Sequence, residues 1–164
     1  MTPDSHRPDL RRIGASAFTE VLATLLSLPV TVPESTNDRP VSDAPDGISS
    51  SVLLAGQRFS GSVHLQLPRA FVAHAVRLLT GLDGDAGNAN ALQDDAAGEL
   101  ANMVAGRVAS QLAADGYSCK LGTPSVARSR LTTQGQPAVA AGRTDLICAG
   151  HWLSLEIQCC YAAS

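Results

Sequence analysis

The longest helical pattern in the chain covers about residues 90–115, and a change of hydrophobic period after it decides the fold class. Up to Gly116, apolar residues recur on one side of a helix. Beyond it, apolar and polar residues alternate, most regularly from Trp152 to Cys159, as in a strand with one buried face. A chain with both patterns must build helices and strands into one core. The apolar positions of the long helix are Leu92, Leu100, Val104, Val108 and Leu112.

Segments with the same two periods occupy most of the remaining chain. Two further amphipathic helices are predicted at about residues 9–27, with Asp9 as N-cap, and at 68–80, with Gly81 after the last turn. The order of helix, two strands, two helices and three strands predicts an α+β fold with an antiparallel sheet. The strands are expected at residues 51–56, 60–67, 117–126, 146–149 and 152–159, and the third of them is expected to be interrupted by Pro124.

The chain of 164 residues is about one domain long. Residues 1–8 carry two prolines and no periodicity, so they are expected to form a flexible tail. Residues 33–47 are rich in Pro, Asp and Ser and suit a surface connection, since neither side alone could build a core. A single domain is therefore expected over residues 9–164.

Composition excludes several function classes. With 45% hydrophobic residues and no apolar run of membrane length, the chain is expected to be soluble and globular. Twelve basic against fifteen acidic residues give a formal charge of −3, which argues against nucleic acid as a partner. Only six residues are aromatic, so aliphatic side chains must fill the core, and Trp152 is expected to lie in it.

No bound cofactor or metal is expected. The four histidines are scattered over the chain without an i, i+4 pair. Residues 81–87 resemble a calcium loop only in composition, because Leu92 stands where the bidentate acid would be, so a flexible loop is expected.

The cysteines and the N-terminal region bear on the compartment. Cys119, Cys148, Cys159 and Cys160 form no CxxC pair and are expected to be buried or half-buried free thiols in a reducing cytoplasm. Two arginines before the apolar stretch of residues 13–28 mimic a twin-arginine leader. The acidic residue within that stretch and its helical spacing favour an amphipathic helix instead.

A polar stripe on the long helix carries the candidate chemistry. Asp95, Glu99, Asn102 and Gly106 fall within an arc of roughly 60° opposite the apolar side. No Lys or Arg shares the arc. A carboxylate there can hold a partner's lysine, a carboxamide can orient a water, and the glycine would let another backbone come close. An ordinary solvated helix face is the alternative.

Residues 95–107 (DAAGELANMVAGR) and 122–126 (GTPSV) resemble the CheX/CheC/FliY family of chemotaxis phosphatases, which dephosphorylate the aspartyl phosphate of receiver domains such as phospho-CheY. The family pattern is Asp or Ser, three residues, Glu, two residues, Asn, then about twenty residues and Pro. Asp95, Glu99, Asn102 and Pro124 fill this pattern. The resemblance extends more weakly over residues 13–32 and 60–68.

The resemblance implies a two-layer sandwich of long helices on the antiparallel sheet and a phosphatase of response-regulator receivers in chemotaxis or two-component signalling. Glu99 would pair with the receiver's lysine, and Asn102 would place the attacking water. Asp95, Gly106 and Pro124 would support them, and the receiver would bring the Mg²⁺.

CheC and FliY carry two Glu-x-x-Asn helices, whereas the corresponding stretch here is Glu20-Val-Leu-Ala23, so the chain looks like single-site CheX. The family also implies a possible homodimer formed through sheet edges. Two alternatives stay open. The chain could be a non-catalytic CheX-like module that binds a receiver or another signalling protein, or an unrelated α+β domain with a solvated stripe.

Overall fold

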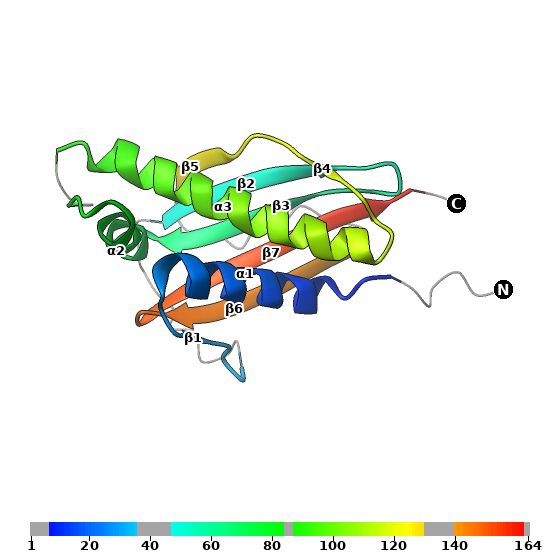
Figure 1. Cartoon of the computed structure of the whole chain (residues 1–164), viewed down its shortest axis with the longest axis horizontal. Coiled ribbons are helices and arrows are strands. Elements are labelled where there is room, and N and C mark those ends of the chain that lie inside the picture. The colour runs from blue at the N-terminus through cyan, green and yellow to red at the C-terminus, as the bar shows by residue number, and fades with distance from the viewer. Residues whose placement is uncertain (1–6, 36–46, 84–86, 130–139, 163–164) are drawn as a thin grey trace.

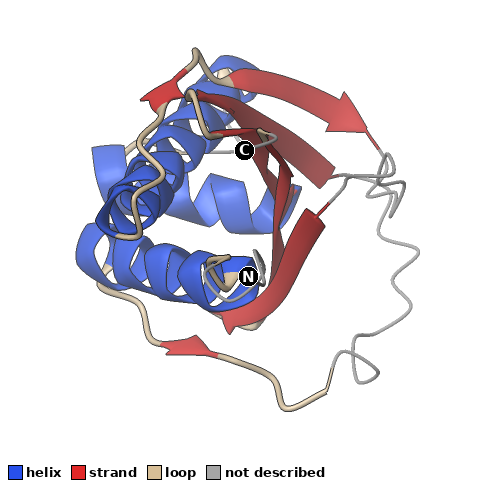
Figure 2. Cartoon of the chain, turned by 90° about the vertical axis from the view of Figure 1, so that its right-hand side faces the viewer, coloured by secondary structure: helices blue, strands red, loops and turns tan. Residues whose placement is uncertain are grey.

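The computed structural model describes residues 7–35, 47–83, 87–129 and 140–162. Three helices lie on one face of a single sheet (Figures 1 and 2). The helices are α1 (Leu10–Leu26), α2 (Arg69–Thr80) and α3 (Ala89–Ala114). The strands are β1 (Val30–Thr31), β2 (Gly47–Ala55), β3 (Phe59–Pro68), β4 (Lys120–Leu121), β5 (Ser125–Ser129), β6 (Ala140–Cys148) and β7 (His151–Tyr161).

All strand pairs in the sheet are antiparallel. The order is β1-β6-β7-β3-β2-β4, and β5 pairs with β2 as well. The predicted α+β class with helices on an antiparallel sheet is therefore confirmed, whereas the two-residue strand β1 was not predicted.

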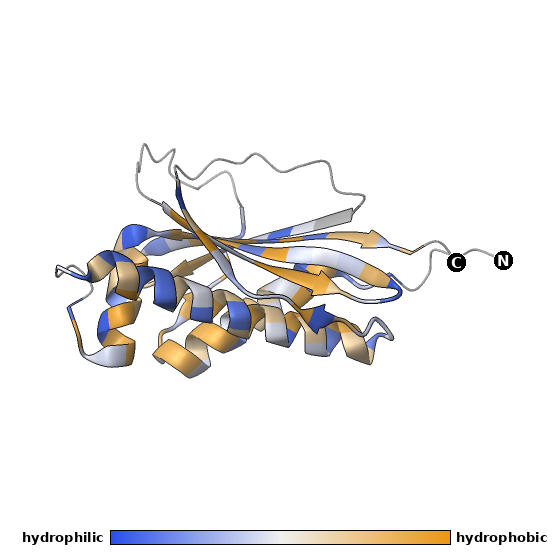
Figure 3. Ribbon diagram, turned by 90° about the horizontal axis from the view of Figure 1, so that it is seen from above, coloured by the Kyte–Doolittle hydropathy of each residue, from blue (hydrophilic) through white to orange (hydrophobic). Residues whose placement is uncertain are grey.

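The core lies between the helices and the inner face of the sheet. Apolar and polar residues alternate along the strands, which leaves one face for the helices (Figure 3). The predicted apolar side of α3 is buried except at Leu92, which is half-buried. Trp152 is half-exposed and outside the core, because the alternation in β7 turns Leu153 and Leu155 toward the helices instead.

Two predicted helix ends are confirmed, whereas Pro68, predicted to begin the second helix, is the last residue of β3 and the N-cap of α2. The Asp9 side chain accepts a hydrogen bond from the backbone N–H of Arg12 at 3.0 Å and caps α1. Gly81 takes φ +70° after α2 and donates its N–H to the Arg77 carbonyl at 3.0 Å. Both ends follow from local chemistry that the sequence displays.

The strand predicted at residues 117–126 is interrupted at Pro124 as expected, but its two parts are separate short strands and β5 extends beyond the predicted end. The chain forms two short strands, β4 and β5, which both pair with β2. Between them, the Gly122 N–H donates to the Leu53 carbonyl at 2.8 Å, and Pro124 has no N–H to give to a ladder. This break positions the candidate site described below.

The last two strands are longer than predicted, and their turn is tight. Ala149 and Gly150 take positive φ angles of 50° and 78° between β6 and β7. The first predicted hairpin is also confirmed, although β2 begins four residues early, at Gly47. The polar residues at the start of β2 obscure the alternation of apolar and polar positions that would mark a strand. The predicted connection at 33–47 and the tail at 1–8 lie largely outside the described residues.

Gly142 allows the start of α1 to lie against β6. A Cβ at this position would be 2.7 Å from the Arg11 nitrogen and 2.8 Å from the Leu10 carbonyl carbon, both backbone atoms that cannot swing aside. We expect Gly142→Ala to lower the free energy of unfolding by about 2 kcal/mol, measured by urea denaturation. An unchanged midpoint would show that α1 shifts freely on the sheet.

All four cysteines are free thiols, as predicted. Cys148 and Cys159 are buried and Cys119 is half-buried, but Cys160 is exposed, because neighbouring residues of β7 face opposite sides of the sheet. Burial raises the pKa of the Cys148 and Cys159 thiols. In the described part of the chain, no helix has the length and apolarity needed to span a membrane.

Candidate functional site

An open depression of about 600 Å³ lies between α3 and the segment that joins β4 to β5. It brings together Asp95, Glu99 and Asn102 from the helix and Pro124 from the segment, four of the residues that the sequence singles out. Its lining consists of Asp94, Asp95, Gly98, Glu99, Asn102, Gly122, Thr123, Pro124 and Val126.

The helical wall is oriented by the opposite side of α3. Leu100 and Val104 are fully buried against the sheet. Asp95 and Glu99 are consequently exposed and Asn102 is half-buried, with its side chain at the depression. The carboxylate and the carboxamide are one turn apart on the same face, so both can reach a single group on a partner.

The second wall is the break between β4 and β5. Pro124 and Val126 pack close to α3 at Gly98, where a Cβ would lie 3.7 Å from the Pro124 Cβ and 3.6 Å from the Val126 Cγ2. Pro124 directly precedes β5, whose first residue Ser125 pairs with Ser51 of β2. The proline therefore sits where the chain turns from the depression into the sheet.

Gly106 lies one turn beyond Asn102, outside the lining of the depression. A Cβ there would be 3.9 Å from the Leu121 Cδ1 of β4, which is an ordinary contact. Packing within the chain therefore does not require a glycine at this position. Leu121 itself is 39% exposed beside it, so the helix backbone and an apolar side chain extend the surface next to the depression.

The depression is acidic. Of its three carboxylates, Asp94 is paired with Arg128 of β5, with 2.9 Å between Oδ1 and Nη2. Among the described residues, neither Asp95 nor Glu99 has an ion-pair partner. Two free negative charges beside a carboxamide suit a partner that brings a cationic side chain.

Sequence reasoning missed Asp94 and Arg128. Asp94 precedes the stripe on α3, and Arg128 is 34 positions away in a strand whose pairing was not predicted. The only available signal was a pair of arginines, Arg128 and Arg130, at the end of a short segment rich in small residues.

A family model described as chemotaxis phosphatase CheX matches residues 48–141, more than half of the chain. The chain belongs to the CheX family. A search of the curated proteins finds no match.

Solved structures of CheX relatives have the same fold. CheX from Vibrio vulnificus aligns with a TM-score of 0.77 at 18% identity, over 93% of this chain and 97% of that one. A CheX-CheY-BeF3-Mg²⁺ complex from Borrelia burgdorferi aligns with a TM-score of 0.73 at 19% identity, over 93% and 99%. FliY from Thermotoga maritima aligns with a TM-score of 0.60 at 19% identity, over 99% and 92%.

Within this CheX-family fold, α1 does not duplicate the arrangement of α3. Glu20 is held by Arg107 of α3 at 3.1 Å, and Ala23 stands where a second carboxamide would be. Gln111 of α3 donates to the Ser16 Oγ of α1 at 3.4 Å. These polar contacts join the two helices and leave α1 without a free acid–amide pair at this point.

The described residues contain no group of three His, Cys, Asp or Glu that could hold a metal ion.

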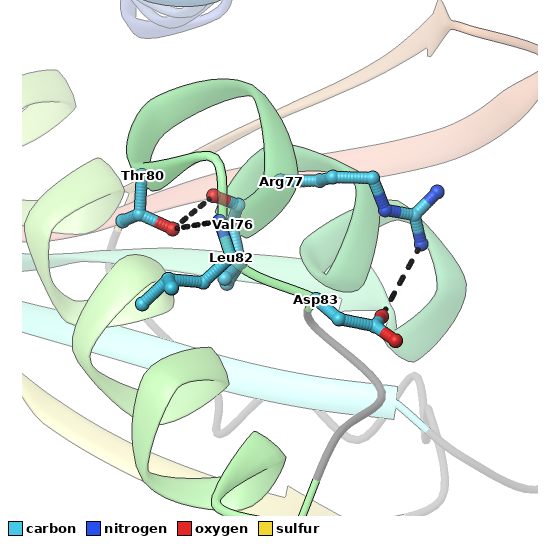
Figure 4. A network of polar contacts seen from close by, with 5 residues as sticks. All are labelled: Val76, Arg77, Thr80, Leu82 and Asp83. Atoms are coloured by element: carbon cyan, nitrogen blue, oxygen red, sulfur yellow. Dashed lines mark hydrogen bonds and ion pairs between the residues drawn. The ribbon is translucent and has the colours of Figure 1, made fainter.

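The loop after α2 is the segment that resembles a calcium loop in composition. In it, Asp83 lies 3.9 Å from the Arg77 guanidinium (Figure 4). The Thr80 hydroxyl donates to the Val76 carbonyl at 2.8 Å and accepts from the Leu82 N–H at 3.1 Å. The middle of this loop, residues 84–86, lies outside the described residues.

Proposed function

We propose that the chain is a phosphatase that hydrolyses the aspartyl phosphate of a response-regulator receiver domain in chemotaxis or another two-component pathway. The observation that carries the proposal is the placement of Glu99 and Asn102 together in one open depression of a CheX-family fold. The depression offers a charged anchor and a group that can orient water, and the chain needs no nucleophile of its own.

Glu99 and Asn102 have separate roles in this proposal. The carboxylate of Glu99 pairs with a lysine of the receiver and fixes its orientation. The amide of Asn102 then holds a water in line with the phosphorus. The water oxygen bonds to phosphorus as the bond between phosphorus and the aspartyl oxygen breaks. Inorganic phosphate leaves, the receiver's carboxylate is restored, and the water's proton passes to solvent.

The receiver supplies the Mg²⁺ that neutralises the phosphoryl oxygens. The Borrelia burgdorferi CheX complex, which contains CheY, BeF3 and Mg²⁺, supports a receiver as the partner. Asp95 adds a second negative charge to the depression, and Pro124 shapes its far wall.

We place the chain in the cytoplasm, because free thiols persist in that reducing compartment and receiver domains are found there.

Two copies of the chain would pair through the outer edge of β6. That edge is covered by β1 only at Ile147 and Cys148 among the described residues, so its remaining backbone groups can accept another strand.

Gly106 tests whether the surface beside the depression faces a partner. We expect Gly106→Ala to raise the free energy of unfolding by about 0.5–1 kcal/mol, because a mid-helix glycine is replaced where a methyl group fits. We expect the same change to weaken receiver binding several-fold, since the methyl group blocks close approach. Thermal denaturation and a binding titration measure the two effects. A gain in stability without loss of binding would remove Gly106 from the interface.

The proposed function is tested by following the decay of phosphorylated receivers from the same genome, in Mg²⁺, with and without the protein. Faster decay of at least one receiver is expected. Binding without faster decay would indicate the non-catalytic module. If no receiver binds or responds, the polar stripe is an ordinary solvated surface.

A further inference from the structure

We infer that Arg128 is a positioning residue of the site, which holds β5 against the first turns of α3 and withdraws the charge of Asp94 from the depression. The inference deepens the proposed function and rests on it. Arg128 touches neither Glu99 nor Asn102, so it acts through the walls that carry them.

The guanidinium of Arg128 makes three contacts with consecutive turns of α3. Nη1 donates to the Gln93 Oε1 at 3.2 Å, Nη2 donates to the Asn90 carbonyl at 2.9 Å, and Nη2 lies 2.9 Å from the Asp94 Oδ1. Gln93 is fully buried, so its carbonyl oxygen has little access to water as a substitute donor. The planar guanidinium holds five N–H donors in a fixed arrangement, whereas a lysine ammonium is a compact point charge on a flexible stem.

These contacts cross from one wall of the depression to the other. Arg128 lies two residues after Val126 and four after Pro124, which form the far wall. Its contacts with α3 lie just before Asp95 and Glu99. The start of α3 has no side-chain cap from Asn88. Arg128 therefore supplies the side-chain anchor that sets the spacing between the helix and the Pro124 segment.

The same contacts set the charge of the depression. With Arg128 in place, Asp94 is ion-paired, and the carboxylates of the depression without an ion-pair partner among the described residues are those of Asp95 and Glu99. Without it, a third negative charge would compete with Glu99 for the cationic side chain of the receiver. Arg128 would thereby direct docking to Glu99, the carboxylate one turn from Asn102.

The test compares Arg128→Ala with the double variant Arg128→Ala/Asp94→Asn in dephosphorylation of a receiver. For Arg128→Ala, kcat is expected to fall roughly tenfold or more because the walls lose their spacing, while KM falls at low salt because Asp94 attracts the receiver. In the double variant KM is expected to return toward the wild-type value and kcat to stay low. A merely destabilised protein would not lower both constants. An unchanged kcat, or a KM that the second change does not restore, would overturn the inference.

Arg107→Ala is the matched control, since it removes an arginine ion pair from the other side of α3. It is expected to leave both constants unchanged. Hydrogen exchange supplies a readout that needs no activity: the amides of residues 90–102 should exchange faster in Arg128→Ala than in Arg107→Ala. If the wild type dephosphorylates no receiver, the proposed function fails, and exchange alone decides whether Arg128 holds the helix. Equal amide exchange rates in the two variants would show that Arg128 does not restrain the start of α3.

Discussion

Asn102→Ala is expected to fold normally and to lose receiver dephosphorylation by about a hundredfold or more. The residue is half-buried at the rim of the depression, on the side of α3 opposite the core, so its truncation leaves no core cavity. The methyl group of alanine can neither donate to nor accept from a water, so the receiver would revert to its own hydrolysis rate. Decay of the phosphorylated receiver measures the loss, and circular dichroism checks the fold.

Two further variants sharpen this experiment. Asn102→Asp keeps the size of the side chain but replaces the amide donor by a negative charge that repels the phosphoryl group, so it should be as inactive as alanine. Gln111→Ala removes another carboxamide of α3, which contacts Ser16 of α1, and should be fully active. Wild-type turnover by Asn102→Ala would exclude this residue as the water-orienting group.

Glu99→Arg is expected to weaken binding of the receiver by about a hundredfold, and Glu99→Ala by about tenfold. The alanine variant loses an attractive charge, and the arginine variant adds repulsion of the receiver's lysine. Glu99 is exposed and has no ion-pair partner among the described residues, so neither variant disturbs an internal contact. Titration with a receiver loaded with beryllium fluoride and Mg²⁺ measures binding without turnover.

Salt dependence distinguishes a lost charge from a distorted surface. Wild-type affinity should fall as ionic strength rises, and the fall should be smaller for Glu99→Ala. Glu20→Ala is the control, because Glu20 is already paired with Arg107 and does not line the depression. Equal binding by wild type and Glu99→Arg would place the receiver contact elsewhere.

The helices and most of strands β2, β3 and β7 could be predicted because their signals are local. The spacing of Leu100, Val104 and Val108 marks the buried side of α3, and Asp9 and Gly81 mark helix ends through contacts within a few residues. The face that carries Glu99 and Asn102 follows directly from the buried side. Their catalytic and binding roles remain predictions.

The parts that could not be predicted depend on contacts between distant segments. Strand β1 consists of two residues that pair with β6, more than a hundred positions later. Pro124 marks the break between β4 and β5 in the sequence, but the pairing of both strands with β2 depends on distant contacts such as the Gly122 N–H that donates to the Leu53 carbonyl. Arg128 gains its role only because β5 pairs with β2 and thus lies beside α3. The sequence next to each of these residues does not show which distant segment the residue will contact.

The openness of the depression limits what the chain can act upon. Pockets for small ligands enclose most of the ligand's surface, whereas this depression is a shallow hollow bounded by one helix and one short segment. A small acyl phosphate such as acetyl phosphate contains the same mixed anhydride, but here it would remain surrounded by bulk solvent. In the proposed reaction, the enclosure that completes the reaction centre would therefore come from the bound receiver. We therefore expect the protein to hydrolyse a phosphorylated receiver and to leave free acetyl phosphate intact.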